Sequence, residues 1–386
     1  MSDSQLSSRP RRGGFYEPPY LDDTGSPGDL LRAEPMTARL LPGVAMSARA
    51  WRVLYRSTNA AGDPIAVSGV ILVPDAPNPL SPRPLLGFAP GTQGLARSVA
   101  ALSRQLAIGV EYEAIFLSAA VRRGWVVAVT DYPGLGTPGV HPYVIGKTNG
   151  RAVLDIMRAA RNLPQADLSA DGPAGLYGYS EGGNSAGWAA QLQPAYAPDV
   201  PLRAVAVGAA PVDFPELVAD LEGGLFAFLM LYAGLGFDSA YPDLRLRDYL
   251  NRGGRMVAAI LRRTHIVGAI VLGLFLPKKR LRYLSADPFV EPDWVAQLHD
   301  NSLGHLAPAA PTLVGIGRQD QVIPYRQAAL LLQRWRALGA DVREHPIRFG
   351  EHITAAPQFA KAGFAFLSEH FRQAEIGATS RERQAG

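Results

Sequence analysis

The sequence contains 386 residues, of which 47% are hydrophobic and 19% are charged. This composition provides ample material for a large core and excludes global disorder. The formal charge of +4 is small for such a length, and no dense run of Lys and Arg appears, so nucleic-acid binding is not expected. The chain has no cysteine, which excludes disulfides, zinc–thiolate sites, iron–sulfur clusters and a cysteine nucleophile.

The first residues are polar and carry Arg9, Arg11 and Arg12, without the apolar core of a signal peptide. We expect 1–14 to be a flexible N-terminal tail. The longest charge-free apolar segments, at 223–237 and 266–276, are shorter than the ~20 residues that span a bilayer, so no transmembrane segment is expected. As written, the chain is expected to be cytoplasmic, although a chain whose signal had been removed would look the same.

The body of the chain alternates between short apolar runs and helical patterns. A Pro- and Gly-rich stretch at 16–42 is expected to form an ordered arm. Short β-branched runs, mostly apolar from the third onward, then predict strands at 51–57, 65–73, 84–89, 125–131, 174–177, 203–207, 311–316 and 342–347. Helices are expected between several of these strands, at 113–123, 150–162 and 325–338. This alternation predicts an α/β fold with a mostly parallel sheet flanked by helices.

One interval breaks the alternation, because 212–302 contains no clear strand and reads as helical. A structureless loop of this length is improbable in a compact domain, so we expect an inserted helical cap. The core would then comprise 15–211 and 303–372, followed by a flexible C-terminal tail at 373–386. The two apolar segments of the insert either pack it onto the sheet or line an apolar pocket or meet lipid.

The strongest local signal is Gly178-Tyr179-Ser180-Glu181-Gly182, which follows an apolar strand and precedes a sequence able to form a helix. A serine nucleophile on such a sharp turn needs residues without side chains two positions before and two positions after it. Gly178 and Gly182 satisfy this condition. The helix that starts at the turn directs its N–H groups and the positive end of its dipole towards Ser180.

A serine nucleophile needs a histidine base and a carboxylate that orients it, here in the chain order Ser, acid, His. Of the seven histidines, only His352 lies in a loop just past the last expected strand. Asp320 lies at the carboxyl end of the preceding strand, before a turn into a helix. We therefore expect Ser180, Asp320 and His352 to meet at one edge of the sheet and to form a catalytic triad.

An oxyanion hole needs two backbone N–H groups directed at the developing charge. One is expected from Glu181, which follows the nucleophile, and the other from the loop Pro90-Gly91-Thr92-Gln93-Gly94 after the third strand. Either Thr92 or Gln93 could supply this second amide. A Pro- and Gly-rich run, Asp131 to Gly139, is expected to be a fixed supporting loop at the same edge.

Several motifs together resemble the secretory lipase family, the lipase-A type of α/β hydrolase. They are Gly-Tyr-Ser-Glu-Gly-Gly from Gly178, Asp131-Tyr132-Pro133-Gly134-Leu135-Gly136-Thr137-Pro138 with His141-Pro142-Tyr143, Gly150-Arg151-Ala152-Val153-Leu154-Asp155, Phe15-Tyr16 with Gly28-Asp29-Leu30-Leu31-Arg32, and Asp320 before Val322-Ile323-Pro324-Tyr325. The resemblance implies an eight-stranded hydrolase with a helical cap, which acts on carboxylic esters including acylglycerols. It assigns the triad to Ser180, Asp320 and His352 and the oxyanion loop to 91–93. The chain departs from the family in Glu181, where many relatives carry Gln, and in its lack of disulfide cysteines and an export signal.

The expected reaction is two-step acyl transfer from a lipophilic ester to water through an acyl-enzyme on Ser180. An acyltransferase with the same triad and a non-catalytic binding protein of the same fold remain as alternatives. No metal or organic cofactor is expected, because no ligand cluster has suitable spacing. The cap is expected to supply the acyl pocket, and Lys278-Lys279-Arg280 suggests transient contact with an anionic lipid surface or simply a solvated run. Candidate pocket residues are Phe226, Leu229, Ile266 and Leu272.

Overall fold

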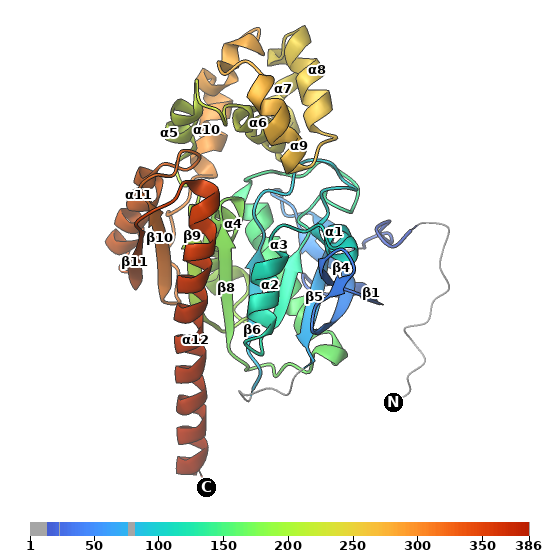
Figure 1. The fold of residues 1–386 in the computed structure, drawn as a ribbon, viewed down its shortest axis with the longest axis vertical. Coiled ribbons are helices and arrows are strands. Elements are labelled where there is room, and N and C mark those ends of the chain that lie inside the picture. Colours follow the sequence, from blue (N-terminus) through green and yellow to red (C-terminus); the bar gives the residue numbers. More distant parts are fainter. Residues whose placement is uncertain (1–13, 23, 76–81, 386) are drawn as a thin grey trace.

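A computed structural model describes residues 14–22, 24–75 and 82–385. The chain folds around a nine-stranded sheet in the order β1-β4-β5-β7-β6-β8-β9-β10-β11 (Figure 1). The strands of this sheet are β1 (Leu30–Met36), β4 (Ala48–Thr58), β5 (Pro64–Pro74), β6 (Leu85–Ala89), β7 (Val126–Thr130), β8 (Ala174–Tyr179), β9 (Leu202–Gly208), β10 (Thr312–Gly317) and β11 (Val342–Ile347). A small two-stranded sheet joins β2 (Arg39–Leu41) to β3 (Val44–Ala45).

The strands from β7 to β11 are parallel, whereas β1, β4 and β5 pair antiparallel at one side. Every residue of β6, β7 and β8 is buried, which explains their continuous apolar runs. Parallel registers align the strand ends: Tyr179 pairs with Gly208, and Gly317 pairs with Ile347. The loops that follow β8, β10 and β11 therefore emerge at the same edge of the sheet.

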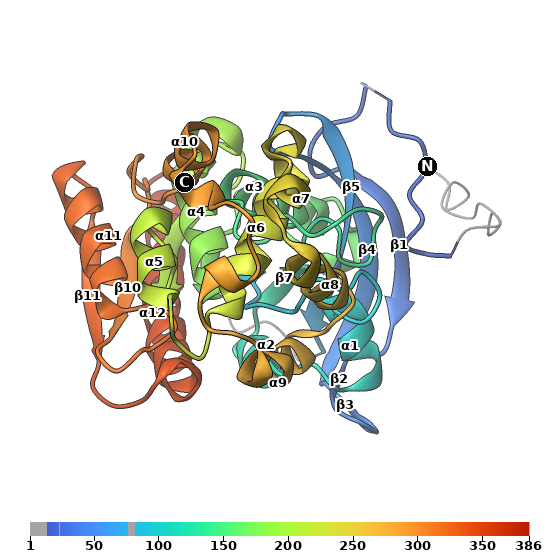
Figure 2. The same ribbon diagram turned by 90° about the horizontal axis from the view of Figure 1, so that it is seen from above.

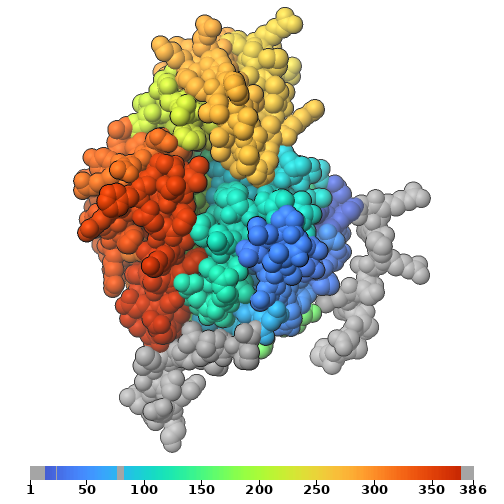
Figure 3. Space-filling model, viewed as in Figure 1, coloured from blue at the N-terminus to red at the C-terminus, as the bar shows by residue number. Residues whose placement is uncertain are grey.

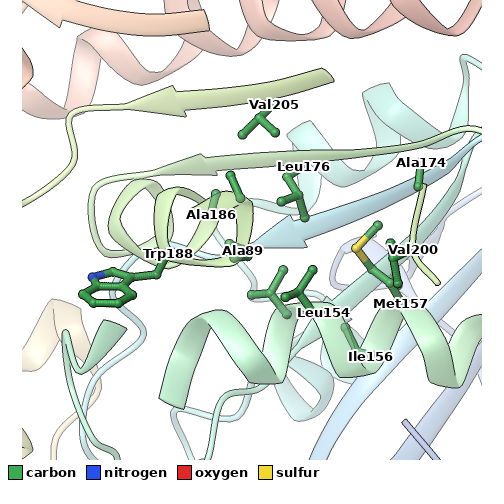
Figure 4. Close-up of a cluster of buried hydrophobic side chains, with 14 of the residues drawn as sticks. Ala89, Leu154, Ile156, Met157, Ala174, Leu176, Ala186, Trp188, Val200 and Val205 are labelled. Atoms are coloured by element: carbon green, nitrogen blue, oxygen red, sulfur yellow. The ribbon is translucent and has the colours of Figure 1, made fainter. Parts of the chain in front are cut away.

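Helices cover both faces of the sheet, and each face has its own apolar core. One core packs α3 (Gly146–Arg161), α4 (Glu181–Tyr196) and α11 (Tyr325–Ala337) on the sheet. Figure 4 shows part of it, with Leu154 and Met157 of α3 facing Leu176 of β8. The opposite face carries α1 (Leu102–Ile108), α2 (Ala114–Val121) and α12 (His352–Ala385). A short 3₁₀ turn at Pro164–Ala166 follows α3.

A helical cap lies over the carboxyl edge of the sheet and is inserted between β9 and β10 (Figures 1 and 2). In the space-filling view it forms a separate lobe above the core (Figure 3). A third apolar cluster joins most of its helices. They are α5 (Phe214–Leu221), α6 (Phe228–Ala240), α7 (Leu246–Tyr249), α8 (Arg252–Leu261), α9 (Ile266–Phe275) and α10 (Pro292–Asp300), with 3₁₀ turns at Pro242–Leu244, Arg280–Arg282 and Pro288–Val290.

The structure departs from the sequence-based expectations at two places. The expected arm at 16–42 contains β1, so the sheet has nine strands rather than eight. This edge strand includes Pro35 and pairs with β4 alone, and its mixed burial leaves a weak apolar signal. Residues 373–385, expected as a tail, continue the backbone of α12 as helix, and most of the expected N-terminal tail, 1–13, lies outside the described residues.

Candidate active site

Ser180 occupies the turn between β8 and α4, with φ of 61° and ψ of −124°. A positive φ is unfavourable for a residue with a side chain, so the surrounding backbone must hold it. The flanking glycines make the turn possible. A Cβ on Gly178 would lie 1.9 Å from the carbonyl oxygen of Gly182, and a Cβ on Gly182 would lie 2.1 Å from that of Ala89. The turn therefore projects the serine hydroxyl at the carboxyl edge of the sheet.

Three side chains from distant parts of the sequence form a chain of hydrogen bonds at this edge. Nε2 of His352 lies 2.9 Å from Oγ of Ser180, and Nδ1 of His352 lies 2.7 Å from Oδ2 of Asp320. The side chains of His352 and Asp320 are only 12% and 2% exposed, so solvent screens these contacts weakly. Ser180 follows β8, Asp320 follows β10, and His352 follows β11.

Asp320 is held by the backbone as well as by the histidine. Its Oδ1 accepts hydrogen bonds from the amides of Val322 and Ile323, at 2.9 and 2.8 Å. These bonds leave Oδ2 directed at Nδ1 of His352. A carboxylate can only accept there, so Nδ1 carries the proton and Nε2 is free to accept the hydroxyl proton of Ser180.

The loop that carries His352 is fixed at the start of α12. Glu351 accepts hydrogen bonds from the amides of Ile353 and Thr354, and the bond from Ile353 is the main reason that the pKa of Glu351 is lowered. The hydroxyl of Tyr179 donates to the carbonyl oxygen of His352 at 2.8 Å. His352 is thus tied both to its own helix and to Tyr179, the residue before Ser180.

The expected oxyanion residues lie on either side of this turn. Glu181 is the first residue of α4, where an amide has no partner within the helix. The Gly91 amide is already engaged, since it donates to Oε2 of Glu113 at 2.8 Å. Within the described residues, the backbone amides of Thr92 and Gln93 donate no hydrogen bond. Both therefore stay available as the second N–H donor of the expected oxyanion hole.

The carboxyl groups of Glu113 and Glu111 accept hydrogen bonds from Gly91 and Gln93 of the loop 91–94. The sequence did not single out either residue. Burial raises the pKa of Glu111 to about 7 and that of Glu113 well above its usual range. Oε1 of Glu111 accepts from Nε2 of Gln93 at 3.2 Å. No sequence pattern marked these residues, because Glu111 reads as an ordinary charge before the expected helix 113–123, and Glu113 as the first residue of that helix.

A buried pair beside Ser180 was also missed in the sequence. Nε2 of His141 lies 2.7 Å from Oε1 of Glu181, and both side chains are almost completely buried. His141 follows the loop 131–139, which was expected to have a supporting role at this edge. The pairing could not be seen in the sequence, since it joins the residue after Ser180 to a loop 40 positions earlier.

The four candidate pocket residues lie in the cap. Phe226 and Leu229 are partly buried and pack against both the α2/α12 core and the cap cluster. Leu272 belongs to the cap cluster, and Ile266 is buried at the start of α9. The Ile266 amide donates to the carbonyl oxygen of Gln93 at 3.0 Å, which joins the cap to the oxyanion loop.

Comparison with known proteins places the chain in a family. The sequence profile of the secretory lipase family matches residues 100–378, so the chain belongs to that family. It is 29% identical to a "Probable inactive lipase MT1628" of Mycobacterium tuberculosis over 92% of this chain and 81% of the relative. It is 25% identical to "Secreted triacylglycerol lipase LIP1" of Malassezia furfur over 94% and 76% of the two chains.

The fold is that of a solved α/β hydrolase. The structure of Candida antarctica lipase A in its closed state superposes with a TM-score of 0.83, covering 94% of this chain and 86% of that one at 22% identity. The expected fold class is thereby confirmed. The family is one of secreted lipases, so the expectation of a cytoplasmic location finds no support among these relatives. Within residues 14–22, 24–75 and 82–385, no helix is long and apolar enough to cross a membrane.

Proposed function

We propose that the protein is a serine carboxylic ester hydrolase, a lipase or esterase, in which Ser180, His352 and Asp320 form the catalytic triad. The observation that carries this proposal is the continuous hydrogen-bond chain from Ser180 Oγ through His352 to Asp320. Membership of the secretory lipase family and relatives described as triacylglycerol lipases support the same chemistry.

In the first step, Oγ of Ser180 attacks the ester carbonyl while Nε2 of His352 takes its proton. Asp320 holds the ring in the required tautomer and stabilises the imidazolium. The amide of Glu181, with that of Thr92 or Gln93, donates to the oxyanion. Protonated His352 then gives its proton to the leaving alkoxide, and the alcohol departs.

In the second step, water replaces the alcohol in the site. His352 takes a proton from water as its oxygen attacks the acyl carbonyl on Ser180. Collapse of the tetrahedral intermediate releases the carboxylic acid, and the proton returns from His352 to Ser180 Oγ. The free enzyme is regenerated, so neither step needs a metal or an organic cofactor.

The acyl chain of the substrate is proposed to lie under the cap. Phe226, Leu229 and Leu272 supply partly buried apolar surface, and Ile266 adjoins the oxyanion loop through Gln93. An acyl group held among these side chains would have its carbonyl near the loop that is proposed to receive the oxyanion. Lipophilic esters therefore suit this site better than polar ones.

The outer surface of the cap is proposed to make transient contact with lipid. Large apolar side chains are exposed on α8 and α9, including Met256, Val271 and Phe275, of which Phe275 is 82% exposed. The segment 244–286 contains ten Lys or Arg residues and one Asp, whereas the remaining acidic residues of the cap lie outside it. Arg262 and Arg280 are paired with carboxylates of those flanking parts, so the unpaired basic groups of the segment carry its positive charge. An anionic lipid surface complements this combination, because it attracts the basic groups and accepts the apolar ones.

The proposal of ester hydrolysis is tested by turnover of nitrophenyl esters of increasing acyl length, below and above their solubility limits. Hydrolysis that rises with acyl length and depends on Ser180 supports a lipase or esterase. Transfer of the acyl group to an added alcohol in preference to water would favour the acyltransferase. Binding of esters without turnover of any of them would favour the binding protein.

Secretion is proposed from the family alone, since its members include proteins described as secreted. To test secretion, the natural gene is expressed in its own host, and the protein is detected by antibody in the culture medium and in the cell contents. Recovery only from the cell contents would contradict it.

A further inference from the structure

We propose that His141 and Tyr143, two residues apart on the loop between β7 and α3, position the two sides of the oxyanion hole through the side chains of Glu181 and Thr92. The inference rests on the proposed ester hydrolysis and assigns new positioning residues to it. Neither residue would touch the substrate. Each would hold a residue whose backbone amide, or whose neighbour's amide, is proposed to stabilise the transition state.

The first contact joins His141 to the nucleophile turn. Its Nε2 lies 2.7 Å from Oε1 of Glu181, and its Nδ1 lies 3.1 Å from the carbonyl oxygen of Pro133. The ring of Tyr132 stacks on the imidazole with centroids 5.4 Å apart. His141 is therefore fixed on three sides, and it fixes the side chain of the residue directly after Ser180.

The two contacts of His141 determine how many protons the pair holds. A carbonyl oxygen only accepts, so Nδ1 must carry a proton towards Pro133. A neutral imidazole would then present a lone pair at Nε2, which a carboxylate at 2.7 Å would repel. One proton must therefore lie between Nε2 and Glu181, and the pair is net neutral whichever partner holds it.

Neutrality matters because of where Glu181 lies. An uncompensated carboxylate one residue from Ser180 would oppose the negative charge that develops on the substrate oxygen. Oε2 of Glu181 has no hydrogen-bond partner among the described residues, and an unpartnered oxygen costs less on a neutral acid than on a carboxylate. His141 thus allows an acidic residue at this position without placing a net charge there.

The second contact joins the same loop to the other side of the hole. The hydroxyl of Tyr143 lies 3.1 Å from Oγ1 of Thr92, and the hydroxyl of Tyr112 donates to the Thr92 carbonyl oxygen at 3.1 Å. Thr92 is thereby held at its side chain and at its backbone. These contacts fix the orientation of the peptide that links Thr92 to Gln93.

The loop itself is held by the cap. The hydroxyl of Ser239 in α6 donates to the carbonyl oxygen of Val140 at 2.7 Å. The ring of Tyr143 packs edge-on against Tyr232 of α6, with centroids 5.6 Å apart. In Figures 1 and 2, α6 lies over this edge of the sheet. Residues 140–143 are therefore clamped between the cap above and the two sides of the oxyanion hole.

A double-mutant cycle on Tyr143 and Thr92 tests whether the hydrogen bond between their side chains positions the oxyanion loop. Tyr143→Phe and Thr92→Val each remove one partner of the bond and keep most of the side chain's shape. Because small displacements of oxyanion donors act on the transition state, we expect kcat to fall about 10-fold in each, with KM within about 2-fold. A boronic acid, which forms a tetrahedral anion on Ser180, should bind about 10-fold more weakly. The double variant should be no worse than either single variant.

Conservative variants keep the test independent of folding. Thr92→Ser retains the hydroxyl and should stay within about 3-fold of the wild type. Glu181→Gln is the neutral isostere that can donate to Nε2 of His141, and it should also stay within about 3-fold, whereas Glu181→Leu should lower kcat about 10-fold. Circular dichroism and melting curves establish that each variant is folded.

Three results would overturn the proposed positioning role. They are wild-type kcat and boronate affinity in Tyr143→Phe, additive losses of kcat in the double variant, or equal losses of kcat in Thr92→Ser and Thr92→Val. A wild-type protein that hydrolyses no ester, and whose Ser180 no phosphonate labels, would instead remove the proposed function itself. The two failures are therefore distinguishable.

Discussion

Nε2 of His352 lies 2.9 Å from Oγ of Ser180, although the two residues are 172 positions apart in the sequence. Parallel strands account for this proximity, because β8 and β11 end at the same edge of the sheet with β9 and β10 between them. The same edge carries Asp320, whose Oδ2 lies 2.7 Å from Nδ1 of His352. The geometry is that of a histidine ready to accept a proton from a serine.

Asp320→Asn should retain the hydrogen bonds from the amides of Val322 and Ile323 through the remaining oxygen. The new amide nitrogen would face Nδ1 of His352 and favour the wrong tautomer. We expect kcat to fall by about 10³–10⁴-fold with little change in melting temperature. The exposed Asp293→Asn serves as the matched control and should leave kcat unchanged. Near-normal kcat in Asp320→Asn would remove this residue from the mechanism.

Gly182→Ala should damage both stability and activity. Its Cβ would lie 2.1 Å from the Ala89 carbonyl oxygen, a backbone atom of β6 that cannot move without disturbing the sheet. We expect a loss of about 3 kcal/mol or more in the free energy of unfolding, measured in urea.

The control for this substitution is Gly268→Ala in α9, where the nearest atom to the new Cβ is 3.8 Å away. Gly268 is the third residue of α9, and alanine is favoured over glycine in a helix, so this variant should gain about 0.5 kcal/mol. Equal effects of the two substitutions would contradict the steric account of the turn.

Glu111→Gln should stabilise the protein at alkaline pH. Burial raises the pKa of Glu111 from 4.5 to about 7, so the folded state holds this proton more tightly than the unfolded chain does. Its contribution to stability is complete below about pH 4.5 and is lost as the pH rises through about 7. At pH 8 the folded wild type contains a buried, ionised carboxylate, which lowers its free energy of unfolding. The amide of the Glu111→Gln variant is uncharged at every pH and has no such cost.

Urea unfolding from pH 5 to pH 8 measures this effect. The difference between Glu111→Gln and the wild type should grow with pH, to the order of 3 kcal/mol at pH 8. The exposed Glu344→Gln is the control and should show no such trend. A difference that is constant with pH would show that Glu111 does not hold a proton in the folded state.

Binding to vesicles tests the proposed lipid-contacting surface of the cap. The wild type should sediment with vesicles that contain phosphatidylglycerol and much less with pure phosphatidylcholine. Lys279→Glu with Arg282→Glu should weaken this binding about 30-fold or more, since each basic group near the surface contributes about 1 kcal/mol. Arg336→Glu with Lys361→Glu makes the same change of charge on the core. Equal losses in both double variants would show that net charge alone, rather than the cap, governs the binding.

The positions of Ser180, Asp320 and His352, the proposed triad, at the ends of β8, β10 and β11 could be predicted because each follows a recognisable strand. The sharp turn at Ser180 was predictable because it needs glycine on both sides, and a Cβ at Gly178 or Gly182 would indeed collide with the backbone. Edge strand β1 was missed because its residues are mostly half-buried and include Pro35. Short apolar runs reveal strands buried on both faces far better than strands at an edge.

The contacts around the oxyanion hole could not be predicted, because they depend on side chains that meet only in the folded protein. His141 and Tyr143 follow a Pro- and Gly-rich loop whose proximity to Glu181 and Thr92 no spacing rule gives. The choice between Thr92 and Gln93 depends on the direction of single peptide groups, which the sequence pattern does not encode. The sequence indicated only that the loop at 131–139 supports this edge of the sheet, not which side chains make the contacts.

The most direct test of the account is the intact mass of the protein after treatment with a fluorophosphonate. An activated serine is expected to gain one adduct, mapped by peptide sequencing to Ser180, while Ser180→Ala and His352→Ala should gain almost none. Ser180→Ala should also lose ester turnover and melt at nearly the same temperature as the wild type. Folded wild-type protein that takes up no label, or takes it up equally when His352 is replaced, would contradict the central claim.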